Sequence, residues 1–122
     1  MKEQLISFET AKLAKENGFD EKCLFFYTGD SKELKQINLK GISNSDTISF
    51  CSAPTQSLLA KWLREKHGID ILVQRSFSNG IKKYILTPCF DKPIPKGYES
   101  VEKNNYEEAL EIALFKSLKY II

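Results

Sequence analysis

Long apolar stretches are missing from this sequence of 122 residues, and their absence excludes several classes of protein. The longest uninterrupted apolar run covers only residues 23–27, whereas a membrane-spanning helix needs roughly 20 such residues. The amino-terminal segment also lacks the apolar core, roughly 7–15 residues long, of a secretory signal peptide. We therefore expect a cytoplasmic protein with no membrane partner.

Cysteine and histidine are scarce. The three cysteines, Cys23, Cys51 and Cys89, are widely spaced and odd in number, whereas a disulfide framework uses an even set. A zinc site needs paired cysteines or neighbouring histidines, and His67 is the only histidine. We expect reduced thiols that pack as small apolar side chains, no metal and no cofactor.

Familiar catalytic motifs are missing as well. The sequence has no glycine-rich phosphate loop, no G-x-S-x-G elbow and no H-E-x-x-H motif. A nucleophilic pair of His67 with Cys51 or Cys89 stays open on spacing alone, because such partners need only be close in space. The commoner role of His67 is to place a cation at a helix carboxyl terminus. We expect no enzyme.

What is present is an ordinary globular composition, with 42% hydrophobic and 28% charged residues. The length suits one hydrophobic core, so the sequence predicts a single domain over residues 1–122.

The first half of the chain predicts helices that flank short strands. A helix follows the cap residue Ser7 and ends at Gly18, and residues 22–28 form a strand. Segment 29–52 is rich in turn residues, with short strands near 37–39 and 48–50. A second helix covers 53–67, with Ser52 or Ala53 as cap, Pro54 in the first turn and Gly68 at the end.

The second half predicts a β-hairpin and a final helix. Asn79-Gly80 favours a tight type I′ turn in a hairpin over 69–87, which pairs Val73 with Leu86 and Arg75 with Tyr84. A proline-rich loop over 88–100 follows, with a brief strand at 98–101. The last helix begins at the cap Asn105, which forms a capping box with Glu108, and continues to about 120.

These elements predict an α+β, two-layer fold in which an antiparallel sheet of three to five strands packs against three helices. The apolar positions of each element predict the core, which comprises Phe8, Leu13, Phe25, Leu59, Trp62, Leu63, Val73, Leu86, Leu110, Leu114 and Leu118.

Positive charge is concentrated in segment 53–86, which has six lysines and arginines against two acids. The exposed members could contact nucleic acid, and the candidates are Lys61, Arg64, Lys66, Lys82 and Lys83. Arg75 is expected on the buried face of the hairpin, with its guanidinium over the Tyr84 ring, and Lys83 on the opposite face. Charges divided between two faces predict only weak, non-specific binding to nucleic acid.

Three strings resemble a family of small phage and prophage proteins of gut Bacteroidetes. They are SAPTQSLLAKWLREKH at 52–67, YEEALE at 106–111 and TAKLAKENGF at 10–19. The resemblance implies a phage setting in a host cytoplasm and assigns no catalytic residue.

Two hypotheses of function follow from these observations. The first is a non-catalytic phage or prophage accessory protein that binds another protein, or a second copy of itself. The alternative is a nucleic-acid-binding module that uses the basic helix and hairpin of segment 53–86.

Overall fold

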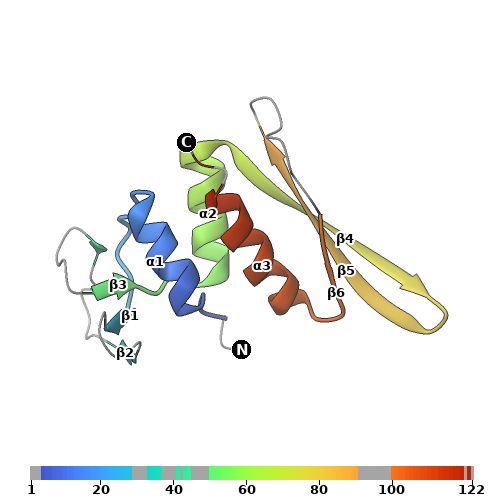
Figure 1. Cartoon of the computed structure of the whole chain (residues 1–122), viewed down its shortest axis with the longest axis horizontal. Helices are drawn as coiled ribbons and strands as arrows, with labels where there is room; N and C mark the ends of the chain where they lie inside the picture. The colour runs from blue at the N-terminus through green and yellow to red at the C-terminus, as the bar shows by residue number, and fades with distance from the viewer. Residues whose placement is uncertain are drawn as a thin grey trace. The chain divides into compact units, whose positions relative to one another are not determined.

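The computed structural model describes residues 4–28, 33–36, 41, 43, 44, 50–90, 100–119 and 121. Within these ranges the chain has three helices and six strands, which confirms the α+β class (Figure 1). The strands form two antiparallel sheets of three, where the sequence predicts one sheet of three to five. Contacts divide the chain into two compact units, Met1–Leu58 and Leu59–Ile122. The single domain stays a prediction.

The first unit combines one helix with a small sheet. Its strands are short and lie in the order β2-β1-β3, with both neighbouring pairs antiparallel. The elements are α1 (Phe8–Glu16), β1 (Phe25–Thr28), β2 (Leu34–Gln36) and β3 (Phe50–Ser52). The strands predicted at 37–39 and at residues 48 and 49 lie outside the described residues.

Both ends of α1 follow the sequence prediction. The Ser7 hydroxyl accepts a hydrogen bond from the backbone N–H of Thr10. At the other end Gly18 adopts a φ of 91°, and the N–H of Phe19 reaches back to the carbonyl of Ala14 over 2.9 Å. This pattern is a Schellman motif, and it buries the Phe19 ring against the unit.

The core of the first unit differs from the predicted one. Ile6, Phe19 and Phe26 are buried, whereas the predicted Phe8, Leu13 and Phe25 are only half-buried, so those three predictions were wrong. Phe8 instead packs edge-on against the Tyr27 ring, with centroids 5.7 Å apart. The Tyr27 hydroxyl donates to the carbonyl of Ile6 over 2.7 Å.

Helix α2 (Gln56–His67) begins later than predicted. Ser52 still belongs to β3, and the N–H of Ala53 bonds to the carbonyl of Phe25, so neither residue caps the helix. The cap is Thr55, whose hydroxyl accepts from the N–H of Leu58 over 3.2 Å, and Pro54 precedes the helix. At the other end, Gly68 with a φ of 65° ends the helix as predicted.

The second unit contains a long hairpin, formed by β4 (Ile69–Ser78) and β5 (Ile81–Phe90). Asn79 and Gly80 have φ angles of 52° and 76°, the positive values that a type I′ turn requires. The predicted register is confirmed, with Val73 opposite Leu86 among ten paired positions.

Strand β5 extends through Pro88 to Phe90, so the predicted loop does not begin at 88. In a two-residue hairpin, Ser78 and Ile81 form a hydrogen-bonded pair, and such pairs then alternate with non-hydrogen-bonded ones. Pro88 opposite Ile71 falls on a non-hydrogen-bonded pair, so the ladder between the two strands loses nothing by its missing N–H.

One face of the hairpin packs against the last helix. Strand β6 (Val101–Lys103) extends the sheet beside β5, and α3 (Tyr106–Lys119) contacts both β5 and β6. The side chain of Asn105 caps α3 by accepting from the N–H of Glu108 over 3.0 Å, as the sequence predicts. The sequence placed the third strand at 98–101, of which residues 98 and 99 lie outside the described part. The predicted core residues Leu59, Trp62, Leu63, Leu86, Leu110, Leu114 and Leu118 are buried.

Candidate functional site

The outer edge of β4 presents unpaired backbone groups. Within the described part of the second unit, β5 is the only strand hydrogen-bonded to β4. The alternation set by the turn directs the N–H and C=O groups of even-numbered β4 residues to β5. Those of Ile71, Val73, Arg75 and Phe77 therefore point outward. An exposed edge of this length can accept another strand.

The opposite edge of the hairpin, along β5, is protected. Strand β6 covers β5 at residues Tyr84–Leu86, and Pro88, the next β5 residue whose groups point to that side, has no N–H. Proline and covering strands are the usual means of blocking an edge. Strand β4 contains neither proline nor glycine.

Large apolar side chains stand exposed along β4. The exposed fractions are 58% for Leu72, 42% for Val73 and 69% for Phe77. The prediction that Val73 belongs to the core was therefore wrong, although its partner Leu86 is fully buried. The difference arises because α3 packs on β5 and β6, while β4 lies at the rim of the sheet.

The face of the sheet that α3 covers, called here the helix-side face, is positively charged at its rim. Side chains alternate between faces, so this face has the odd-numbered residues of β4 and the even-numbered residues of β5. Its members are Ile69, Ile71, Val73, Arg75, Phe77, Lys82, Tyr84, Leu86, Pro88 and Phe90, with Val101 and Lys103 of β6. Three of them are cations and none is an acid.

Arg75 does not occupy its predicted place. The side chain lies on the helix-side face but is exposed, because β4 is the rim strand. The cation over the Tyr84 ring is Lys82, whose ammonium lies 5.8 Å from the ring centroid, and the Tyr106 ring packs edge-on against Tyr84 with centroids 5.6 Å apart. The Arg75 guanidinium is thus available at the open edge.

The predicted nucleic-acid contacts are not brought together on one surface. Lys61 and Arg64 of α2 lie 4.0 Å from carboxylate oxygens of Glu65 and Asp70. Lys83 pairs with Glu102 over 3.3 Å on the face opposite Lys82. Lys66 is exposed near the end of α2.

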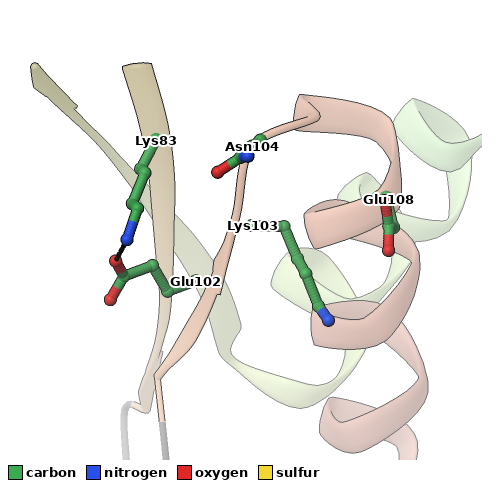
Figure 2. Close-up of a pocket in the computed structure, with 5 residues that line it drawn as sticks. All are labelled: Lys83, Glu102, Lys103, Asn104 and Glu108. Carbon is green, nitrogen blue, oxygen red and sulfur yellow. Dashed lines mark ion pairs between the residues drawn. The ribbon is translucent and has the colours of Figure 1, made fainter. Parts of the chain in front are cut away.

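An open hollow of about 480 Å³ lies where β6 leads into α3. Its lining residues are Lys83, Glu102, Lys103, Asn104 and Glu108, and all are exposed. Figure 2 shows the Lys83–Glu102 pair on one side of β6 and Lys103 extending toward the helix on the other. Two lysines balance two glutamates here, so the hollow favours neither an anion nor a cation.

The thiols differ in their exposure. Cys23 and Cys51 are buried and Cys89 is exposed, and all three are unpaired. Burial raises the pKa of the Cys23 thiol to about 11, a Ser52 hydrogen bond partly opposes this, and the Glu21 charge adds to it. Burial also raises the pKa of Cys51, against the opposing charges of Lys15 and Lys12. Neither buried thiol is an activated nucleophile at neutral pH.

Two further observations concern the described residues alone. In them, histidine, cysteine and acidic side chains form no group of three that could hold a metal ion. No helix among them is long and apolar enough to span a membrane.

Comparison with known proteins gives no relative, because no family model, curated protein or solved structure matches this chain. The site must be interpreted from its own geometry. The sequence analysis did not predict the open edge. The alternation of hydrogen-bonded pairs, counted from the turn at Asn79-Gly80, and the position of Pro88 together indicate which β4 backbone groups point outward.

Proposed function

We propose that this chain is a non-catalytic binding protein that captures an extended segment of another protein along β4. The resemblance of its sequence to phage and prophage proteins further supports an accessory role in a phage setting. The observation on which the proposal rests is a ten-residue strand that, among the described residues of its unit, pairs with another strand along one edge only.

Strand addition suits this edge for two reasons. A segment beside β4 would form hydrogen bonds with the outward groups of Ile71, Val73, Arg75 and Phe77, which supply affinity independent of sequence. The exposed side chains of Leu72, Val73 and Phe77 would lose contact with water at the same time. Exposed apolar groups on an open edge promote aggregation, and a partner strand would prevent it by covering that edge.

The nucleic-acid alternative has less support. Three of its five candidate residues are beside acids, and Lys82 and Lys83 point to opposite faces of the hairpin. A phosphate backbone requires several cations on one surface.

Substitution of Val73 by proline tests the proposal. The Val73 N–H points outward, so V73P removes a bond to an added strand and none to β5. Proteins captured by the wild-type chain from phage-infected, nuclease-treated host cells should be lost with V73P. Circular dichroism should show V73P folded, whereas Q74P, which removes an inward N–H, should be destabilised.

Retention of every captured protein by folded V73P would overturn the proposal. If V73P does not fold, F77P serves as the second variant, since the N–H of Phe77 also points outward, close to the turn.

A further inference from the structure

The chemistry of the partner follows from the charges beside the open edge, an inference that rests on the proposed function. We infer that the segment added to β4 has an acidic residue beside Arg75, with apolar residues two positions to either side. The partner is thus an acidic, apolar extended peptide of a different protein.

Arg75 lies at the middle of the exposed apolar run. On the helix-side face it follows Val73 and precedes Phe77, and both apolar neighbours are exposed. A strand added beside β4 continues the faces of the sheet, so every second residue would contact this row. The row of Val73, Arg75 and Phe77 is therefore matched by an apolar, acidic, apolar alternation.

The surrounding charges reinforce the preference for an acid. Lys82 is opposite Phe77, and diagonal to Arg75, on the same face. None of the helix-side residues of β4, β5 and β6 is an acid that could neutralise Arg75. Asp70 is the one acid of β4, and it lies on the other face, 4.0 Å from Arg64.

A second copy of this chain does not meet the requirement. Two copies joined antiparallel through β4 by a twofold axis would form one sheet, in which odd-numbered residues face odd-numbered residues. In every such register, the residue opposite Arg75 is apolar or is Arg75 itself. Self-pairing also adds the cations of one helix-side face to those of the other, and like charges in proximity oppose association.

The opposite face of β4 sets a weaker condition. On that face the exposed Gln74 and the half-buried Ser76 flank Arg75, with the exposed Leu72 beyond Gln74. These neutral side chains tolerate small polar or apolar neighbours, so we expect no charge selection at the intervening positions of the partner.

A displayed library of random ten-residue peptides tests the inference. Selection on the immobilised full chain should enrich peptides in which Asp or Glu has apolar residues two positions before and after it. Synthetic versions of these peptides should lose about fivefold or more in affinity for R75E, measured by fluorescence polarisation. Peptides with Lys in place of the acid should regain that affinity for R75E.

The controls separate the two proposals. K12E makes the same change in net charge on the exposed face of α1 and should alter affinity less than twofold. Binding that is lost with folded V73P or F77P but unchanged with R75E would overturn the acidic partner and leave strand addition intact. Absence of any peptide sensitive to the outward prolines would overturn the proposed function as well.

Discussion

Cys23 illustrates how burial alone determines the chemistry of a residue. Its side chain is 6% exposed, and its sulfur lies 3.5 Å from the carbonyl oxygen of Glu21, the acceptor for its S–H. Removal from water disfavours the thiolate, so the pKa rises from 9.0 to about 11. The sequence shows a cysteine before a strand but does not show how deeply it is buried.

This shift predicts a pH dependence of stability. Because the folded pKa is the higher one, the contribution of the buried thiol is fully present below about pH 9 and decreases as the pH rises toward 11. Urea unfolding under reducing conditions should therefore show a larger stability difference between wild type and C23A at pH 8 than at pH 10.5. A difference that grows with pH would contradict the burial of this thiol.

Cys89 should react first with a maleimide, because it is the exposed thiol.

Val73 and Arg75 show where residue-level prediction stops. Asn79-Gly80 fixes the register, so the sequence correctly assigns both residues to the same face as Leu86. It does not indicate which strands of that face the helix covers. The covering helix begins only at Tyr106, far along the chain from both residues, so local patterning contains no information on its position.

At the level of elements, prediction succeeded where one local interaction decides the structure. The Ser7 cap, the Gly18 and Gly68 ends and the Asn105 cap all stand as predicted. The start of α2 was wrong because two hydroxyl residues compete for the cap. Backbone pairing of Ser52 with Phe26 retains that residue in β3, and Thr55 becomes the cap. Such competition depends on a partner strand distant in sequence.

The unequal burial of the hairpin predicts unequal costs for two chemically identical substitutions. L86A removes a fully buried side chain beneath α3 and should destabilise the protein by about 2–5 kcal/mol. L72A removes a side chain that is 58% exposed on the opposite face and should cost less than about 0.5 kcal/mol. Urea denaturation measures both values. Equal losses of stability for the two variants would show that β4 is covered, which would contradict the proposed open edge.

At the scale of the whole molecule, composition and periodicity were sufficient for the α+β class. They did not predict the division of six strands into two sheets, because the number of strands does not determine which strands pair. The candidate nucleic-acid residues were similarly chosen from their concentration in one segment. Whether such charges form one surface depends on the face to which each strand residue points and on nearby acids. Here Lys82 and Lys83 point to opposite faces, and Glu102 pairs with Lys83.

The distribution of charge predicts how the chain responds to salt in the presence of duplex DNA. Arg75, Lys82 and Lys103 share the helix-side face and, within the described residues, have no ion-pair partner, so at most about three phosphate contacts are expected there. Three contacts would lower affinity about fortyfold between 50 and 200 mM salt, whereas five would lower it about five hundredfold. Fluorescence polarisation with a labelled duplex measures this slope, and reversal of both Lys61 and Arg64 to glutamate should leave it unchanged. A steep slope abolished by that double reversal would favour the nucleic-acid alternative, because those two side chains would then have exchanged their acidic neighbours for phosphates.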